Sequence, residues 1–490
     1  MSAAGIVRTG AIEPCFPWPR HILTPDGWRN LAAALVDDPL PLLASWADTT
    51  HVHALFLEAA ADAALLASVP VEAGTYPALS PVRPGAAWYE RMIRDLWGHE
   101  AAGGTDQRPW LDHGQWVATR PLSPRPGPPV TGPEPPEFRT EGGAAAMQLP
   151  IGPVWGSLEE PAHLRLTVEG TRIVRAEARL GYAYRGILTL MRGKPVRAAA
   201  RFVARLSGDC TVAHSMAFAT AAEAALQVTV PPRATVLRAM MMEVERAAGH
   251  LNELSALAGL ADLGRAQARL GEAREVMARA AGVAFGHRLM MDCVVPGGVI
   301  AETTPAGVGA LRAAIGSALA ALDAVAPLAA RLHGLGRTTA GDVLTFAAGG
   351  VTGRAANRNF DARDVQSGRE PAASRRTRTG GDAAARCQLR AEEIGNALAR
   401  LRRLTSEEPG GAISAVLPAA SGEGVGCAES IRGDIWHWLR LDHGQIAAVF
   451  PRDPGWALWP LAERVLAGAD VADQALIRRS LGLPASGMDL

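Results

Sequence analysis

One stretch decides the fold: Pro231-Pro-Arg-Ala-Thr-Val-Leu-Arg-Ala-Met-Met-Met-Glu-Val-Glu-Arg-Ala-Ala-Gly-His-Leu-Asn-Glu-Leu-Ser-Ala-Leu-Ala-Gly-Leu260. Proline suits the first turn of a helix, where its missing N–H group is not needed, and the following residues predict a helix that runs to about Leu260. Three more long runs predict helices of the same kind: Gln267–Phe285, Pro305–His333 and Asp382–Leu404. Four long helices of this kind indicate a helix bundle.

Strand signals lie on both sides of this predicted bundle. Residues His163–Leu180 alternate around a Gly170-Thr171 turn, which predicts a β-hairpin. After Gly410-Gly411 the pattern predicts four strands and a last helix: Ala412–Leu417, Gly424–Glu429, Ile435–Leu441, Gln445–Phe450 and Trp459–Ala467. The expected fold class is α+β, with a long-helix bundle core flanked by an N-terminal β-hairpin and a C-terminal β region.

A proline-rich segment divides the chain. Pro121–Pro136 contains eight prolines, and because proline fixes φ and removes a hydrogen-bond donor, we expect a stiff, extended linker there. We place the linker at residues 121–143, between a small α+β domain at 1–120 and a large domain at 144–490. Trp88–Leu96 predicts a helix within the small domain.

Composition limits the classes of function. The chain has 490 residues, 48% of them apolar, and its 49 basic residues balance 49 acidic ones, which argues against a nucleic-acid-binding protein. No apolar run approaches the roughly 18–20 residues that span a bilayer, and no signal-peptide core is present near the N-terminus, so we expect a cytoplasmic location. The five scattered cysteines include no Cys-x-x-Cys pair, so the chain alone does not supply the local thiolate spacing of an iron–sulfur site.

The long helix carries a candidate polar site. Glu243, Arg246 and His250 fall at i, i+3 and i+7 and therefore share one face. Buried charges need partners, so these side chains form either an internal ion pair that locks helices together or a polar cluster that lines a cofactor-facing cleft. His163, which follows Glu159-Glu160 and precedes the first hairpin strand, is by itself compatible with a capping or surface role.

A glycine-rich segment, Gly422–Gly433, contains Glu429 and Arg432. It is not a dinucleotide-binding fingerprint, because the glycine spacing differs and no helix follows. Glycines in strands permit close approach of another backbone or of a cofactor, and they also form bulges and tight turns.

These segments, in order, resemble the large-subunit family shared by respiratory complex I (the 49 kDa type) and the group 4 [NiFe] hydrogenases. Ile151–Arg165 is similar to its opening strand motif, and Gly181-Tyr-Ala-Tyr-Arg185-Gly-Ile187 to a Gly-Tyr-x-His-Arg-Gly-x signature. The later matches are Ser207–Ser215, Glu243…His250, Pro296–Val299, Gly381…Glu393 and Gly422–Gly433. In the small domain, Ala87-Trp-Tyr-Glu-Arg-Met-Ile-Arg-Asp-Leu-Trp-Gly98 resembles the complex I 30 kDa-type subunit, and the proline linker would be the fusion joint.

The departures from the family pattern concern its metal ligands. The resemblance implies two cysteine pairs for nickel, but the early pair is Ser207 and Cys210. We expect the late pair near Arg452-Asp453-Pro454, where Gly455 follows and no cysteine comes after. A hydroxyl is a poor substitute for a thiolate at nickel. The sequence therefore predicts no metal site and no turnover of H2.

The complex I resemblance implies a quinone-like acceptor in a cavity. It implies that His163 contacts the acceptor, but Gly208 stands where a quinone-contacting tyrosine is expected and Arg279 where the acidic partner of the histidine is expected. We expect catalytic roles in a proton-coupled network for four more residues: Arg185, Glu243, Arg246 and His250. The residues expected to face the cofactor are His163, Cys210, His214, Glu429 and Arg432.

The resemblance also implies partners. We expect no cofactor bound by this chain alone, and a [4Fe–4S] cluster held nearby by an iron–sulfur small subunit of the complex I 20 kDa type. A ferredoxin-like subunit and membrane antiporter-like and anchor subunits would place the complex on the cytoplasmic face of the inner membrane and couple electron transfer to ion pumping. Two alternatives are a non-catalytic scaffold and the fused 30 kDa/49 kDa-type subunit of a standard NADH–quinone reductase, in which NADH is oxidised on another subunit.

Overall fold

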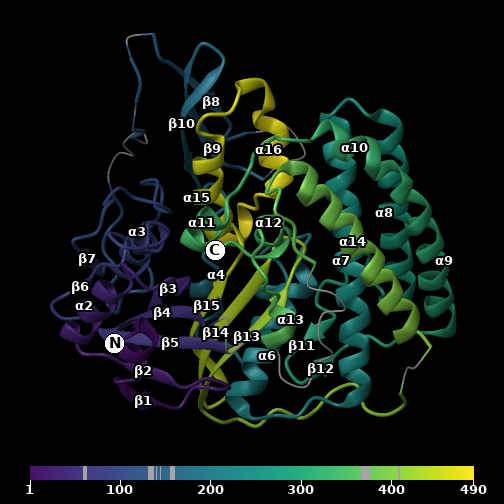
Figure 1. Cartoon of the computed structure of the whole chain (residues 1–490). Helices are drawn as coiled ribbons and strands as arrows, with labels where there is room; N and C mark the ends of the chain where they lie inside the picture. The colour runs from purple at the N-terminus through teal and green to yellow at the C-terminus, as the bar shows by residue number, and fades with distance from the viewer. Residues whose placement is uncertain are drawn as a thin grey trace.

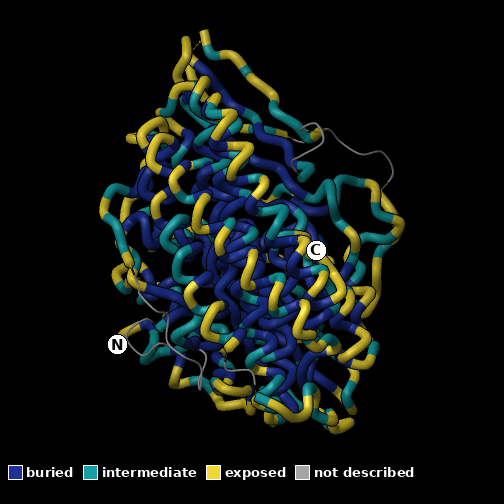
Figure 2. The backbone as a smooth tube through the Cα atoms, turned by 90° about the vertical axis from the view of Figure 1, so that its right-hand side faces the viewer, coloured by how far each residue is buried: buried dark blue, intermediate teal, exposed yellow. Residues whose placement is uncertain are grey.

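The computed structural model describes residues 1–58, 63–130, 137–139, 141–143, 145–154, 160–365, 376–406 and 409–490. It confirms the α+β fold class. Figure 1 shows the N-terminal domain on the left, the long helices side by side on the right, and the C-terminal sheet between them. Buried backbone runs through the middle of the molecule, and exposed positions lie mainly on its outer turns (Figure 2).

The N-terminal domain is built on one mixed sheet. Its strand order is β1-β2-β5-β4-β3, in which β2 and β5 are parallel and the other pairs are antiparallel. The helix expected at Trp88–Leu96 is confirmed as α3. The elements are α1 (Ala3–Val7), β1 (Ala11–Glu13), β2 (Arg20–Ile22), α2 (Pro25–Ala34), β3 (Leu42–Ala47), β4 (His51–Glu58), β5 (Ala63–Pro70), β6 (Thr75–Pro77), α3 (Ala86–Trp97) and β7 (Glu100–Ala102).

The bundle expected from the long apolar runs is confirmed. The Asp382 side chain caps the last of its long helices by accepting a hydrogen bond from the Ala385 N–H group, 2.8 Å away. The third run is divided by a short 3₁₀ turn at Leu322–Ala324. The helices are α7 (Pro232–Leu260), α8 (Gly264–Phe285), α9 (Pro305–Ala321), α10 (Val325–Arg331) and α14 (Ala383–Leu404).

One bundle helix corrects the expectation that no segment is apolar enough to span a bilayer. Residues Pro305–Arg331 form a helical stretch with a mean hydropathy of 1.7 in its most apolar window. Alanine supplies much of this hydropathy. Because 44% of that window is buried and α9 packs on α8 and α14, the stretch has the packing of a bundle helix.

Two three-stranded antiparallel sheets complete the large domain. The first has the order β10-β9-β8 and contains the predicted hairpin, and the second is β13-β14-β15. The strands are β8 (Met147–Ile151), β9 (His163–Glu169), β10 (Arg172–Arg179), β13 (Gly422–Glu429), β14 (Asp434–Asp442) and β15 (Gln445–Arg452), with a two-stranded pair β11 (Val294–Val295) and β12 (Gly298–Val299). The remaining helices are α4 (Ile187–Met191), α5 (Val196–Val203), α6 (Thr211–Leu226), α11 (Ala340–Phe346), α12 (Gly350–Ala355), α13 (Ala362–Val365), α15 (Gly455–Leu466), α16 (Gln474–Leu481) and α17 (Ser486–Asp489).

Two local predictions are wrong. Ala412–Leu417 is not a strand: within it the Ile413 carbonyl accepts a backbone hydrogen bond from Val299 of β12, and the Ala415 N–H group donates one to Gly297 in the turn before β12. The first part of the proline-rich linker is not extended, since Thr119 and Gly127 pair across a set of turns. Within the rest of the linker, residues 131–136 and 140 lie outside the described residues.

The glycine-rich strand β13 packs directly on α6. A Cβ atom placed at Gly422, Gly424 or Gly426 would lie 2.2–2.3 Å from a backbone carbonyl oxygen of α6. These alternate glycines therefore remove the side chains from one strand face so that the helix backbone can approach. Of the possibilities that the sequence left open, close approach of another backbone is the one found at these three glycines.

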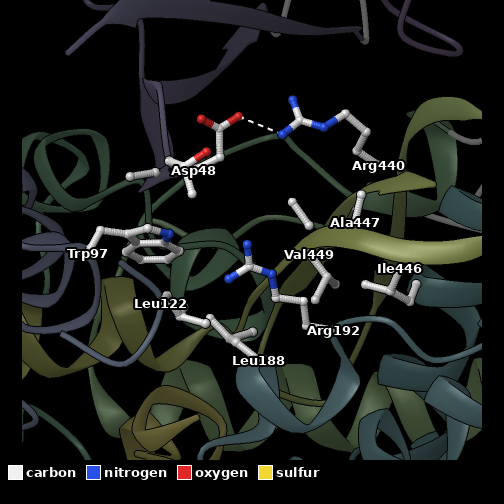
Figure 3. Close-up of a pocket in the computed structure, with 12 residues that line it drawn as sticks. Asp48, Trp97, Leu122, Leu188, Arg192, Arg440, Ile446, Ala447 and Val449 are labelled. Atoms are coloured by element: carbon white, nitrogen blue, oxygen red, sulfur yellow. Dashed lines mark hydrogen bonds and ion pairs between the residues drawn. The ribbon is translucent and has the colours of Figure 1, made fainter. Parts of the chain in front are cut away.

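The two domains share a polar and aromatic junction. Phe16 pairs with Gly424 at the edge of β13, and the Trp46 ring stacks on Phe450 with centroids 5.3 Å apart. A hollow of about 60 Å³ lies at this junction, and Asp48 and Arg440 form a 2.8 Å ion pair there. Figure 3 shows these two side chains pointing toward each other. A second inter-domain ion pair joins Arg20 Nε to Glu423 Oε1 at 2.8 Å, and both side chains are buried.

We expect Glu423→Ala to lower the free energy of unfolding by about 3–5 kcal/mol, because it leaves the buried guanidinium of Arg20 without its counter-charge. It also removes the acceptor of the Trp438 indole N–H group. Glu58→Ala is the matched control, since the Glu58–Arg8 pair is much more exposed to solvent and should contribute about 0–1 kcal/mol. Guanidinium denaturation measures both, and equal losses would contradict a stabilising role for the buried pair.

Candidate functional site

A cavity of about 220 Å³ lies where the loop before α6 meets the C-terminal end of the chain. A smaller hollow of about 50 Å³ shares Gly208, Asp209 and Asn252 with it. A Cβ atom at Gly208 would meet nothing within 4 Å, so the glycine found where a tyrosine is expected leaves this space open. Further lining residues of the larger cavity are Glu160, Ala162, Arg432, Arg478, Arg479 and Leu483.

The guanidinium of Arg432 lies beside Cys210. It binds Asp209 through two hydrogen bonds of 2.6 Å, approaches Cys210 Sγ at 3.5 Å and donates to the carbonyl of Gly482 at 2.8 Å. A contact of 3.4 Å to Glu253 uses its last N–H group. Arg432 therefore acts as a fixed cationic strut that connects α6, α7 and the C-terminal segment, and its donors are already occupied.

The remaining groups of the early ligand segment are also committed. Ser207 is buried and donates a 3.0 Å hydrogen bond to Asp209. Burial, and next the Asp209 carboxylate, raise the pKa of the Cys210 thiol well above its ordinary value, so this sulfur is protonated at neutral pH. Burial opposes ionisation of Asp209 as well, but Arg432 outweighs it and holds the pKa of this carboxyl well below its usual range.

The structure corrects the expected position of the late segment. Asp453 does not line the cavity; it binds His214, one helical turn beyond Cys210, at 3.0 Å. The cavity is closed instead by residues 482–486, where Leu483 and Ala485 are lining residues. Glu160 fixes this segment by accepting hydrogen bonds from the Ala485 and Ser486 N–H groups and from the Ser486 hydroxyl. No cysteine follows Cys427 in the sequence, so the late segment has no thiol and Cys210 is the single cysteine of the early segment.

These residues do not fit a nickel ion. The early segment offers one thiol, Cys210, and a hydroxyl at Ser207, and a hydroxyl is a poor substitute for a thiolate at nickel. At the tail, a Cβ atom on Gly487 would lie 2.2 Å from Asp453 Oδ2, so a side chain there would have to displace the Asp453–His214 pair. Across the described residues, no group of three or more His, Cys, Asp or Glu side chains is arranged to hold a metal ion.

A buried ionic network lies behind the cavity, between α7, α12, α13, α14 and β13. It includes the predicted residues Glu243, Arg246 and Glu429 and joins them through Arg354 and Glu393. Its ion pairs include Arg363–Asp361 at 2.6 Å, Arg354–Asp361 at 2.8 Å, Arg354–Glu393 at 3.0 Å and Arg246–Glu243 at 3.2 Å. Burial, followed by the neighbouring Asp361 carboxylate, raises the pKa of Glu429 to about 8. This group can therefore exchange a proton near neutral pH.

His250 is bound to Arg390 and not to a member of this network. Its Nδ1 atom lies 3.2 Å from a terminal nitrogen of Arg390, which also donates to the carbonyls of Ile431 and Ser480. Burial and then the Arg390 charge lower the pKa of His250 well below its usual value, so the imidazole is neutral and accepts the hydrogen bond.

His163 and Arg185 lie apart from that network. The His163 ring packs on Phe138 with centroids 4.7 Å apart, and its buried Nε2 atom has no hydrogen-bond partner among the described residues. Its neighbour Ala162 lines the cavity, whereas His163 does not. Arg185 donates to the carbonyls of Arg205, Leu206 and Ser486 and so braces the loop before α6 against the tail. Arg279 lies on the bundle surface and binds Glu275.

Sequence reasoning missed several site residues. Asp209 and Glu160 were visible within quoted motifs, but nothing in a single sequence shows that Asp209 would bind Arg432. His437 and Asp453 belong to β14 and to the turn after β15, so their contact with His214 depends on how α6 packs. Arg354 and Asp361 fall in short helical turns without a periodic pattern.

Three family models match the chain in sequence order. Residues 23–125 match the 30 Kd subunit of the respiratory-chain NADH dehydrogenase, residues 185–267 match nickel-dependent hydrogenase, and residues 267–420 match the 49 Kd subunit of the respiratory-chain NADH dehydrogenase. The hydrogenase match and the 49 Kd match meet at residue 267, inside the bundle.

Named relatives cover most of the chain. Hydrogenase-4 component G of Escherichia coli is 29% identical over 88% of this chain and 79% of its own length, and formate hydrogenlyase subunit 5 of the same organism is 28% identical over 83% and 75%. A solved archaeal respiratory membrane complex, the membrane-bound sulfane sulfur reductase, contains a chain that shares the fold with a TM-score of 0.66 at 21% identity, covering 71% of this chain and 99% of that one.

The Ser207/Cys210 segment, the fused N-terminal domain and these matches lead to one conclusion. The chain belongs to the oxidoreductase large-subunit family shared by group 4 hydrogenases and the 49 kDa subunit of complex I, with a 30 kDa-type domain fused at its N-terminus and without the nickel-ligand cysteines.

Proposed function

We propose that this chain is the large subunit of a membrane-associated oxidoreductase complex that works without nickel. It forms one wall of an electron-acceptor cavity beside a [4Fe–4S] cluster held by an iron–sulfur partner subunit. The observation that supports the proposal most strongly is the cavity of about 220 Å³ at Gly208. The cavity is present although the Arg432–Asp209 ion pair lies beside Cys210, the single cysteine of the early ligand segment.

In this proposal the acceptor is quinone-like and enters through the cavity. Two buried groups supply charges that respond when an electron and a proton arrive: the ionic network that joins Arg246 to Glu429 through Glu393 and Arg354, and the separate His250–Arg390 pair. Because the members are buried and paired, a change at one end alters the pairing at the next. Membrane partner subunits of antiporter-like type would convert that response into ion pumping.

The purified complex should contain iron and acid-labile sulfide but nickel well below one atom per complex, because neither ligand segment offers a pair of thiolates. Elemental analysis measures this, and viologen-linked H2 oxidation should be absent. The culture medium should contain added nickel, so that a low content reflects the site and not the supply. One nickel per complex would refute the proposal.

Gly208→Phe should fill the cavity and lower turnover by about tenfold or more, because a blocked site removes the positioning on which electron transfer to the acceptor depends. Turnover is measured with dithionite-reduced viologen as donor and a short-chain ubiquinone as acceptor. Gly309→Phe is the matched control, since a Cβ atom at Gly309 on the bundle surface also meets nothing within 4 Å.

The same assay separates the proposal from the non-catalytic scaffold. A scaffold predicts that the Gly208→Phe complex assembles and turns over at the control rate. His163→Ala tests the predicted contact with the acceptor: a loss of turnover in an assembled complex supports it, and an unchanged rate removes His163 from the site. A complex that oxidises NADH through a co-purifying flavin protein would instead indicate a standard NADH–quinone reductase.

A further inference from the structure

Three buried side chains form a hydrogen-bonded chain beyond Cys210. Asp453 Oδ2 lies 3.0 Å from His214 Nε2, and His214 Nδ1 lies 3.2 Å from His437 Nε2. All three are at most 1% exposed. They come from the turn after β15, from α6 and from β14, so the chain exists only because α6 packs on the C-terminal sheet.

The hydrogen bonds determine which ring nitrogens of His214 and His437 can carry protons. The carboxylate of Asp453 accepts from the Gly455 N–H group at 2.7 Å and requires a proton on His214 Nε2. His214 Nδ1 can then accept from His437 Nε2–H, or it can carry a second proton and donate to His437 Nε2. The two states differ by one proton and need no displacement of heavy atoms.

The outer end of the chain is the Nδ1 atom of His437. His437 Nδ1 is buried and has no hydrogen-bond partner among the described residues, and Phe218 flanks the ring with centroids 6.0 Å apart. A proton that binds His437 Nδ1 allows the Nε2 proton of the same ring to pass to His214 Nδ1. One proton is gained and none is lost, so the chain becomes more positive by one charge.

Among the groups around these three side chains, Asp453 is the one that balances the added positive charge. Arg452 and Asp434 form a buried 3.1 Å pair that is neutral overall. Tyr89 from α3 and Cys210 from α6 also face the site, and both are neutral because burial raises their pKa values well above the ordinary ones. From α7, Glu245 accepts hydrogen bonds from the Val212 and Ala213 N–H groups at the start of α6, and burial raises its pKa to about 8.

We propose that Asp453, His214 and His437 form a proton-loading chain: His214 takes up a proton, through His437, when an electron reaches the neighbouring cavity, and Asp453 is the positioning residue that stabilises the imidazolium. This inference rests on the proposed function. Negative charge added near Cys210 favours a positive charge one helical turn away, since the interior screens charges weakly. Gly487 makes room for the pair, because a Cβ atom there would overlap Asp453 Oδ2.

His437→Phe in the whole complex removes the relay but keeps a ring that packs against Phe218. We expect the complex to assemble with normal thermal stability, and the quinone-linked turnover to fall by about tenfold or more, as for loss of a proton-transfer group. His443→Phe is the matched control, because His443 is exposed at the far end of the β14–β15 hairpin. Full turnover in assembled His437→Phe complex would overturn the relay.

Asp453→Asn tests the charge and keeps the proposal falsifiable if the first variant fails to assemble. The carboxylate favours protonated His214, so its loss lowers the pH at which turnover becomes half-maximal on the alkaline side, by about one unit or more. If Asp453 had only a structural role, its replacement would change thermal stability but not the pH of half-maximal turnover on the alkaline side, which is the alkaline limb of the pH profile. An unmoved limb, or a wild-type profile that is flat from about pH 5 to about pH 9, contradicts the proposal.

Gly208→Phe is assayed beside these variants to keep the two proposals distinguishable. If Gly208→Phe blocks turnover while His437→Phe and Asp453→Asn match the wild type, only the proton-loading chain is refuted. If Gly208→Phe also turns over normally, the acceptor cavity itself is refuted.

Discussion

The contact between α6 and β13 is the constraint on which the site depends. Three alternate glycines leave the face of β13 toward α6 without side chains at these positions, and a Cβ atom at any of them would overlap a carbonyl oxygen of α6. The helix is therefore held at backbone distance from the sheet. Cys210 and His214 come from the start of α6, while Arg432 and His437 come from the sheet or from the loop between its strands, so one packing contact sets the distances between all four.

Charge pairing then decides what the cavity can do. A buried guanidinium is tolerated only with its acceptors in place, and Arg432 has Asp209, Glu253 and the Gly482 carbonyl. The same pairing uses all five N–H groups of Arg432, so this side chain has no free donor for a molecule in the cavity. The cavity has polar walls, but the early segment has one cysteine and a serine, and no cysteine follows Cys427.

Parts of this architecture were accessible to sequence reasoning because they rest on local signals. Long apolar runs that begin at proline or at Asp382 predicted the bundle, and alternation around Gly170 predicted the hairpin. Helix α6 gave no such signal, because most of its residues are buried on all sides and its apolar positions show no 3.6-residue period. Ala412–Leu417 looked like a strand by composition, but a strand also needs a partner along its length, and that partner is a matter of tertiary structure.

The sequence alone determined which chemical groups are available: one cysteine where two are needed, none after Cys427, and a glycine in place of a tyrosine at position 208. It also determined the family, because motif order survives without knowledge of the fold. Only the tertiary structure decided where the late segment lies, that Arg432 stands beside Cys210, and that Asp453, His214 and His437 meet. The contacts of Arg432 with Cys210 and of His214 with both partners join residues more than two hundred positions apart, and no local pattern encodes a distance set by the packing of a helix on a sheet.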